Sequence, residues 1–511
     1  MPEYLSPGVY IEEIETGAMP IEGVGTSTAG FVGPTERGPV EPQLVTSFAD
    51  YQRTFGGVTT ASFQGSDTPR KSYLAYAVDG FFRNGGSRVF VGRVTAGEAE
   101  TATATIGDVT VRANGPGTWG TNVQVEVAES DIEGRFTVFV RYWRDGIPDD
   151  DSVEPTVEER YDDLDATEGT PDYYAKSVNN ASSLVEIDEN APGALPVGTT
   201  ALEAGADGEL GVDDFEGVED DVVPTPSGGE RIRRTGLKGF TQVDEIAIVC
   251  IPDEAKLSGL RGLLRGHCRE TEDRFAILQT DQGVNPDTLS TDGLPNDAVS
   301  ERGLAALYYP WVKVLDPFTN VETLVPPGGH VAGVYARTDT NRGVHKAPAN
   351  EQLQGVQGLE HEIRRVDQNG LNPKGINCIR AFRGRGIRIW GARTTSPKTI
   401  WRYVNVRRLF LFLEESLDEG TQWAVFEPND EPLWARVRQS VTDFLTGVWR
   451  DGALQGTTPE EAFYVKCDRT TMTQDDIDKG RLIIEVGVAP VKPAEFVIFR
   501  ITQWTAGAEG A

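Results

Sequence analysis

The 511-residue sequence predicts a multidomain protein of the α/β (α+β) class. Short apolar strands alternate with helical patterns in residues 21–94 and again from residue 236, which is typical of a partly parallel sheet covered on both faces. Residues 95–235 interrupt this rhythm with stretches rich in Thr, Gly, Asp and Glu, and β-prone segments stand near both chain ends. We therefore expect mixed α/β core domains, an inserted β-rich outer domain, and extended N- and C-terminal β-strand arms.

These changes in composition divide the chain into segments that we interpret as domains and arms. They are an N-terminal extended arm (1–20), the first part of an α/β domain (21–94), an inserted acidic β-rich surface domain (95–235), the second part of the α/β domain (236–355), a C-terminal domain (356–490) and a C-terminal strand arm (491–511).

The N-terminal arm contains one short β-prone piece, in which Pro7 and Gly8 oppose a helix. Its apolar side chains are Val9, Tyr10, Ile11 and Ile14. Because a lone strand is unstable in water, we expect this piece to dock on another sheet, and a flexible tail is the alternative interpretation.

The first part of the α/β domain begins with the apolar run Ala29–Gly33, which predicts a short buried strand. Ser47 is a predicted start of a helix that continues to Phe55, because a serine side chain can cap the first backbone N–H groups. The remaining predicted elements are strands at 43–45 and 88–94 and a helix over 72–84.

The second part repeats this alternation. The predicted strands are Ile246–Ile251, Phe275–Leu278 and Trp311–Leu315, and the predicted helices are Glu254–His267, Ser300–Leu307 and Gly329–Arg337.

The inserted segment carries most of the net charge of the protein. Alternating polar and apolar residues predict strands at Val123–Val127 and Phe136–Arg141. Residues 145–222 then hold 24 acidic and two basic side chains, whereas the whole chain has a net charge of −31. This acidity argues against general binding to nucleic acid or to anionic membranes. We interpret the segment as a solvated surface, with salt adaptation, or weak Ca²⁺ binding at Asp149–Asp151 and Asp213-Asp214, as the alternatives.

Residues 371–417 predict a compact β-β-α unit. The β-prone runs Ile376–Phe382 and Gly386–Ala392 are joined by a Gly-rich turn, and the apolar pattern of Trp401–Leu417 predicts a helix. This unit carries so much apolar surface that we expect other elements, from this chain or from another copy, to cover it.

The C-terminal part predicts an amphipathic helix over Pro432–Trp449 and strands at Phe463–Cys467 and Leu482–Ala489. The last predicted strand, Glu495–Ile501, is apolar on both faces and follows two prolines. We therefore expect it to pair outside its own domain, through Phe496, Val497, Ile498, Phe499 and Ile501.

Motifs of catalysis and cofactor binding are missing from the sequence. It contains no phosphate-binding loop, no paired cysteines with metal-ligand spacing and no histidine in a catalytic setting. We therefore expect no cofactor, no metal and no catalytic activity, and interpret the cysteines as reduced core residues. The alternative, an α/β hydrolase-like enzyme, would need one of the histidines His267, His330, His345 and His361.

A cluster of arginines between residues 380 and 393 is the one concentrated basic feature of the sequence. Because aromatic stacking platforms are missing and the rest of the chain is acidic, we expect these side chains to pair with an acidic protein surface rather than with nucleic acid. They are Arg380, Arg383, Arg385, Arg388 and Arg393.

Several motifs, in this order, resemble contractile tail sheath proteins. They are Leu5-Ser6-Pro7-Gly8-Val9-Tyr10, Phe31-Val32-Gly33, Phe82-Arg83-Asn84-Gly85-Gly86, His330-Val331-Ala332-Gly333 with Asp339 and Arg342-Gly343, Trp390-Gly391-Ala392-Arg393-Thr394, and Phe426-Glu427-Pro428-Asn429. The resemblance covers residues 1–94 and about 236–505, and the acidic insert departs from it.

The resemblance implies a homo-oligomeric helical sheath around an inner tail tube, with baseplate and terminator proteins as further partners. The two strand arms would add to the C-terminal domains of neighbouring copies, and contraction would be a rigid-body rearrangement of tethered subunits. The acceptor sheet would contain Ile376, Ile379, Ile387 and Ile389, and the tube-facing helix over 432–449 would contact the tube through Arg436 and Arg438.

The resemblance also bears on where the protein acts. The N-terminus lacks the basic and apolar regions of an export signal, and no run of residues is long enough to span a membrane, so we expect assembly in the cytoplasm of the producing cell. This argues against a third hypothesis, a surface adhesion protein. Type VI secretion sheaths divide these parts between two chains, which favours a phage tail, a tailocin or an extracellular injection particle here.

Overall fold

The computed structural model describes residues 19–150, 152–189 and 195–500, which form two compact units. The larger unit comprises residues 25–408 and 493–500, and the smaller one residues 19–24 and 409–492. The predicted N-terminal strand side chains Val9, Tyr10, Ile11 and Ile14, and also Ile501, lie outside the described residues.

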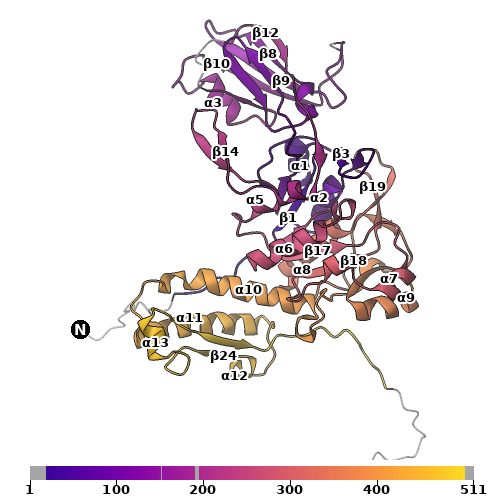
Figure 1. Ribbon diagram of the computed structural model, residues 1–511, viewed down its shortest axis with the longest axis vertical. Coiled ribbons are helices and arrows are strands. Elements are labelled where there is room, and N and C mark those ends of the chain that lie inside the picture. Colours follow the sequence, from indigo (N-terminus) through magenta and orange to yellow (C-terminus); the bar gives the residue numbers. More distant parts are fainter. Residues whose placement is uncertain (1–18, 151, 190–194, 501–511) are drawn as a thin grey trace, which may run out of the picture. The chain divides into compact units, whose positions relative to one another are not determined.

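An eight-stranded sheet forms the centre of the larger unit (Figure 1). Its strand order is β2 (Gln43–Val45), β5 (Val89–Arg93), β1 (Ala29–Gly33), β16 (Ile248–Cys250), β17 (Phe275–Gln279), β18 (Ala305–Tyr309), β22 (Ile376–Phe382) and β23 (Gly386–Ile389). The six inner strands run parallel, while β2 and β23 are antiparallel edges. The predicted mixed α/β class, with its partly parallel sheet, is confirmed.

Helices cover both faces of this sheet, as two neighbouring residues of β1 illustrate. Phe31 contacts Phe81 of α2 (Leu74–Arg83), with ring centroids 5.6 Å apart. Gly30 faces Phe240 of α5 (Gly236–Phe240), whose ring occupies the place of a Cβ. Since successive side chains of a strand point to opposite faces, α2 and α5 lie on opposite sides of the sheet.

The other helices of the larger unit are α1 (Phe48–Phe55), α4 (Val212–Glu216), α6 (Leu260–Thr271), α7 (Pro286–Asp292), α8 (Gly328–Arg342) and α9 (Arg365–Leu371). As predicted, the Ser47 hydroxyl caps α1 by accepting from Asp50 N. The larger unit also has three small sheets. One contains β13 (Glu209–Leu210), β3 (Thr60–Phe63) and β4 (Arg70–Lys71), and a second contains β14 (Asp221–Pro224) and β15 (Glu230–Arg233). The third contains β20 (Glu322–Val325), β19 (Val312–Leu315) and β21 (Val356–Leu359).

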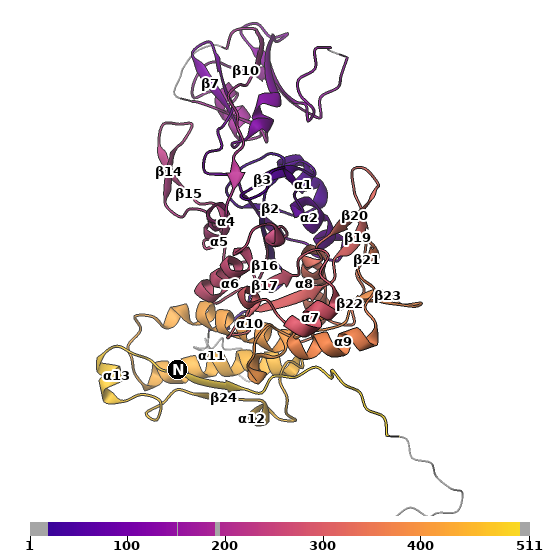
Figure 2. The same cartoon turned by 45° about the vertical axis from the view of Figure 1, so that its right-hand side comes forward.

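The inserted segment has a hydrophobic core of its own, which contains Val125, Val138 and Tyr174. Figure 2 shows its ribbon, with the strands β7 (Val109–Ala113) and β10 (Val157–Leu164) labelled. The two predicted strands are confirmed and pair with each other in one sheet. The segment also contains a second sheet and α3 (Tyr174–Asn179). One sheet contains β10 (Val157–Leu164), β9 (Phe136–Tyr142), β8 (Val123–Glu129) and β12 (Gly198–Ala201), and the other β11 (Val185–Ile187), β7 (Val109–Ala113) and β6 (Thr103–Ile106).

The smaller unit is built on two long helices. The helix α10 (Val404–Thr421) begins in the larger unit and continues into the smaller one, and α11 (Glu431–Arg450) follows it. The unit also contains α12 (Pro459–Ala462), β24 (Phe463–Lys466), α13 (Gln474–Asp478) and β25 (Glu485–Val488). Residues 19–24 run along α10, where Val24 N donates to Ser416 Oγ at 3.1 Å.

Three predicted helices differ from the structure. The helix predicted over 300–307 is wrong, because Ala305–Tyr309 is the strand β18, fully buried between β17 and β22. Pairing on both edges outweighs the helical preference of Ala and Leu. The helix predicted from Glu254 begins only at Leu260, since Gly259 takes a left-handed conformation with φ of 104°. The helix α8, in contrast, continues beyond the predicted end at Arg337 to Arg342.

Candidate interaction surfaces

The C-terminal segment is fixed to the larger unit at one residue, Glu495. Its carboxylate accepts two hydrogen bonds from Arg393, from Nε at 2.8 Å and from Nη2 at 2.7 Å. Asn372 Nδ2 donates to the same carboxylate at 2.7 Å and Tyr403 OH at 3.1 Å. Burial alone would raise the pKa of Glu495, but these hydrogen bonds and the Arg393 charge lower it below its ordinary value.

The four residues after this anchor are large, apolar and exposed. Phe496, Val497, Ile498 and Phe499 are 70%, 72%, 79% and 83% exposed. Residues 495–500 form no strand in the single chain, which differs from the prediction, because no strand of the described residues pairs with them. A strand without a partner has no ladder hydrogen bonds to hold it.

The predicted acceptor side chains lie on β22 and β23. Ile376, Ile379 and Ile389 are fully buried in the sheet, and Ile387 is half-buried. The outer edge of β23 is already used: Ile387 O accepts from Leu353 N at 2.9 Å, and Ile389 exchanges hydrogen bonds with Asn350 N and Glu351 O. Another strand could join this edge only by displacing residues 350–353.

A second sheet, in the smaller unit, is the other candidate to accept a further strand. In the described residues β24 pairs only with β25, in antiparallel register from Phe463↔Val488 to Lys466↔Glu485. The helix α11 packs against β24 and covers one face. Two strands rarely make a stable sheet by themselves, so this hairpin offers an open edge for a further strand.

The arginine cluster surrounds the hairpin of β22 and β23, and the predicted hairpin connection is confirmed. Arg380 donates to Ile363 O and to Gln368 Oε1, Arg388 to Asn350 O, and Arg393 to Glu495. Arg383 and Arg385 are exposed at the tip and form no ion pair within the described residues. Three arginines are thus used within the chain, and two remain available to a partner.

The predicted tube-facing helix is α11, one residue longer at each end than expected. Arg436 is half-buried, pairs with Glu427 at 3.1 Å and lies over the Trp423 ring. Arg438 is exposed. Of the two candidate contacts, Arg438 is the more accessible.

A buried ion pair, which the sequence reasoning missed, lies where α10 leaves the larger unit. Arg408 donates to both carboxylate oxygens of Asp339, at 3.0 and 2.7 Å, and both side chains are 3% exposed. Arg408 also donates to Thr26 O, and Thr26 Oγ1 donates to Asp339 at 2.8 Å. An arginine within an apolar helical pattern was the available signal, because buried arginines need a carboxylate partner.

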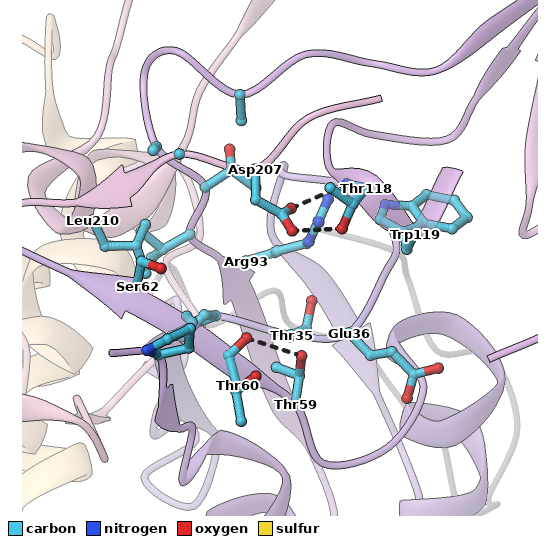
Figure 3. Close-up of a pocket in the computed structure, with 18 of the residues that line it drawn as sticks. Thr35, Glu36, Thr59, Thr60, Ser62, Arg93, Thr118, Trp119, Asp207 and Leu210 are labelled. Carbon is cyan, nitrogen blue, oxygen red and sulfur yellow. Dashed lines mark hydrogen bonds between the residues drawn. The ribbon is translucent and has the colours of Figure 1, made fainter. Parts of the chain in front are cut away.

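A polar cavity of about 470 Å³ lies at the base of the inserted domain (Figure 3). Asp207 accepts from Thr118 N and Thr118 Oγ1, at 3.1 and 2.6 Å, and the buried Arg93 donates to two backbone carbonyls. Since the acceptors of Arg93 are Gly38 O and Pro116 O, this side chain joins the inserted segment to the preceding part of the chain, whereas the Asp207–Thr118 bonds lie within the insert. Histidine is not among the residues that line this part of the described structure.

Two of the four histidines named by the alternative enzyme hypothesis have aromatic or basic neighbours. His267 faces Arg274 at 3.1 Å, and His361 stacks on Tyr309. The four cysteines are buried, as expected for core residues. Within residues 19–150, 152–189 and 195–500, no three His, Cys, Asp or Glu residues are grouped as metal ligands, and no helix is long and apolar enough to cross a membrane.

Comparison with known proteins identifies the family. The model of the phage tail sheath protein central domain matches residues 237–395, and that of the phage tail sheath C-terminal domain residues 396–503, so together they span more than half of the chain. The tail sheath protein of Burkholderia phage BcepMu is 33% identical over 198 residues, which are 37% of this chain and 40% of that protein. A putative prophage major tail sheath protein of Pseudomonas aeruginosa is 28% identical over 38% of this chain and 51% of that one.

A solved structure is similar over almost the whole length. The helical sheath of the anti-feeding prophage in its contracted state is 26% identical and covers 98% of this chain and 100% of that one, with a TM-score of 0.58. The chain spans about half or less of the curated relatives that it matches. The family is one of structural sheath proteins rather than enzymes, as the sequence predicted. These matches and the shared fold show that the chain belongs to the phage tail sheath protein family.

Proposed function

We propose that this protein is the sheath subunit of a contractile tail or injection particle. Many copies stack as helical rings around an inner tube, and contraction of the sheath drives the tube through a target envelope. Membership of the sheath family supports this function, together with similar structures described as an extracellular contractile injection system sheath and as a helical sheath.

Strand exchange between copies is the proposed means of assembly, and the C-terminal segment is the observation that carries it. Four consecutive large apolar side chains follow the anchored Glu495 and are 70–83% exposed in the single chain. Burying one Val, Ile or Phe side chain stabilises a protein by about 1.5–3 kcal/mol. A segment with such side chains on both faces buries the most apolar surface when it joins a sheet as a strand, and it is stabilised most in that way.

The proposed acceptor lies in another copy. In the described residues the hairpin of β24 and β25 pairs with no third strand, although residues 453–455 bond to residues 489–491 just after β25. The β22–β23 sheet with Ile376, Ile379, Ile387 and Ile389 remains the alternative acceptor, at the cost of releasing residues 350–353. The N-terminal strand around Val9 and Ile14 would add to the same sheet.

The remaining partners follow from this assembly. The exposed face of α11 with Arg438, and Arg436 beside it, would contact the inner tube protein. Baseplate and terminator proteins would close the two ends of the sheath. The protein would assemble in the cytoplasm of the producing cell and act in a phage tail, a tailocin or an extracellular contractile particle.

Electron microscopy of the purified full chain tests this function. We expect rings or hollow tubes from the intact protein, and unassembled protein with an unchanged unfolding midpoint after deletion of residues 496–511. Two matched variants, Phe496→Ser with Ile498→Ser and Val497→Ser with Phe499→Ser, identify which face of the added strand packs inward. Monomeric intact protein across salt concentrations, with and without the tube protein, would contradict the proposal.

A further inference from the structure

Phe426, in the connection between α10 and α11, is the most exposed large apolar residue described. Its relative exposure is 103%, and that of the preceding Val425 is 57%. The backbone of Phe426 is left-handed, with φ of 67°. For a bulky side chain this conformation is a true outlier, and such strain persists only where the surrounding structure imposes it and where function uses it.

Contacts hold residues before and after Phe426. After it, Asn429 accepts from Trp434 Nε1 at 2.7 Å and donates to Arg481 O at 3.0 Å, and Glu427 pairs with Arg436. Before it, the Trp423 ring lies under the guanidinium of the same Arg436. Residues 425–427 thus present Phe426 to solvent as a knob between held neighbours.

The residues that flank this knob in the sequence are acidic, although Glu427 is paired with Arg436. Residues 418–431 contain five acidic side chains and no basic one. Glu419 and Glu431 form no ion pair within the described residues. The partner that fits is therefore an apolar surface with a basic rim.

The same chain carries such a surface at the β22–β23 hairpin. Residues 380–393 contain five arginines and no acidic side chain. The Phe382 and Trp390 rings contact each other with centroids 4.5 Å apart, and the Arg385 guanidinium lies over both rings. Arg383 and Arg385 remain exposed without an ion pair in the described part of the chain.

We propose that the Phe426 knob of one copy docks on the Arg383–Arg385 hairpin of a second copy. The aromatic ring packs on the Phe382–Trp390–Arg385 cluster, while the acidic rim faces the arginines. Both surfaces are exposed in the single chain. Two different complementary patches on one subunit make a head-to-tail contact, which builds rings or helical filaments rather than a closed pair.

This inference rests on the proposed polymerisation and adds to it a contact separate from the strand arms. Substituting Phe426→Ala should raise the protein concentration needed for half-maximal assembly by about tenfold, since a buried aromatic anchor carries much of an interface's energy. The matched control is Val366→Ala, an exposed apolar residue at 63%. Phe426→Gly should likewise impair assembly, yet raise the unfolding midpoint, because glycine relieves the left-handed strain.

A charge exchange and a disulfide identify the partner surface. Glu427→Arg and Arg385→Glu should each impair assembly, and the double variant should recover at least half of the loss. Mixing a Phe426→Cys chain with an Arg383→Cys chain under oxidation should give a disulfide between the two chains, against a low background because the four native cysteines are buried.

Each result separates the two proposals. Failure of the wild-type chain to assemble overturns the proposed function itself. Assembly of the wild-type, Phe426→Ala and Arg385→Glu chains at equal concentrations leaves that function in place and overturns the docking contact. A disulfide from Phe426→Cys to a Val9→Cys chain, in place of the Arg383→Cys chain, would show that the N-terminal arm occupies the knob and would also overturn it.

Discussion

Arg393 holds Glu495 through two nearly parallel hydrogen bonds, Nε to Oε1 at 2.8 Å and Nη2 to Oε2 at 2.7 Å. The pair joins the β22–β23 region to the segment that leads into the exposed residues 496–499. The Glu495 side chain is 19% exposed, so water weakens the pair little. In the proposed assembly, a strand donated to another copy would transmit force only if its base is fixed, and this ion pair would fix it.

Replacing Glu495 by Gln should release the base of the C-terminal segment. The glutamine amide has the shape of the carboxylate but lacks its charge and cannot accept both hydrogen bonds from Arg393. We therefore expect the local free energy of unfolding to fall by about 1–3 kcal/mol. Hydrogen exchange of the Glu495 and Arg393 amides measures it. The control Glu301→Gln removes the exposed pair with Lys398 and should cost less than about 1 kcal/mol. Equal protection in both variants would refute the anchor.

The Glu495 anchor should also depend on pH. Because the folded pKa of Glu495 lies below its ordinary value, its stabilisation is present above the ordinary glutamate pKa of about 4.3 and is lost as pH falls through the lower folded value. The difference in exchange protection between wild type and Glu495→Gln should therefore shrink below about pH 4. A difference that stays constant down to pH 3 would contradict this.

Two buried histidines predict a further acid sensitivity. Burial lowers the pKa of His267 to about 3 and that of His330 to about 4, with nearby arginines adding to both shifts. In the unfolded chain both histidines take up a proton near about pH 6.5, whereas in the folded chain they stay neutral to a lower pH. The free energy of unfolding therefore falls as pH is lowered from about 6.5 to 4, by up to about 2.7 kcal/mol per pH unit for the two residues together. Denaturant unfolding of a His267→Gln and His330→Gln double variant should show a flatter profile than wild type.

Burial raises the pKa of Glu254 to about 8. Between about pH 6.5 and 4 this shift makes the folded protein more stable as pH falls, which is opposite to the effect of the histidines. Glu254 is present in both proteins, so its contribution is the same in both. The comparison of the two profiles therefore isolates the histidines. Parallel profiles for wild type and the double variant between pH 6 and 4.5 would contradict the prediction.

Removing Asp339 should destabilise the larger unit strongly. Asp339→Ala leaves the Arg408 charge buried at 3% exposure without its carboxylate, which costs about 3–5 kcal/mol. The double variant Asp339→Leu with Arg408→Met should lose much less, because no buried charge remains. Urea unfolding measures both, and Asp475→Ala, which breaks an exposed pair with Lys479, is the control. A double variant as unstable as Asp339→Ala would refute the explanation.

The close contact between α2 and α8 depends on glycine. A Cβ at Gly329 would overlap the backbone of Ala77, so Gly329→Ala should force the helices apart and cost about 1–3 kcal/mol. In contrast, a Cβ at Gly262 on α6 meets nothing within 4 Å, and Gly262→Ala should stabilise by about 0.5–1 kcal/mol. Denaturant midpoints of the two variants should therefore move in opposite directions.

The sequence predicted those elements whose pattern depends on their own residues. The strands Ala29–Gly33 and Ile376–Phe382 match the structure residue for residue, because a short apolar run bounded by Gly or Pro has few other ways to bury its side chains. The helix α11 was likewise evident from its stripe of apolar residues. The order of the motifs gave the family, which the comparisons confirmed.

The tertiary structure decided everything that depends on distant partners. Ala305–Tyr309 became a strand because β17 and β22 pair with it on both sides, although its residues favour a helix. Glu495 became an anchor because Arg393, 102 residues away, meets it. Phe426 is exposed between residues that contact α11, since Trp434 donates to Asn429 and Arg436 pairs with Glu427. By itself the sequence determined the local elements and the family, because a helix or strand pattern depends on neighbouring residues. Contacts between residues far apart in the chain form only when the fold brings those residues together, so the tertiary structure decided them.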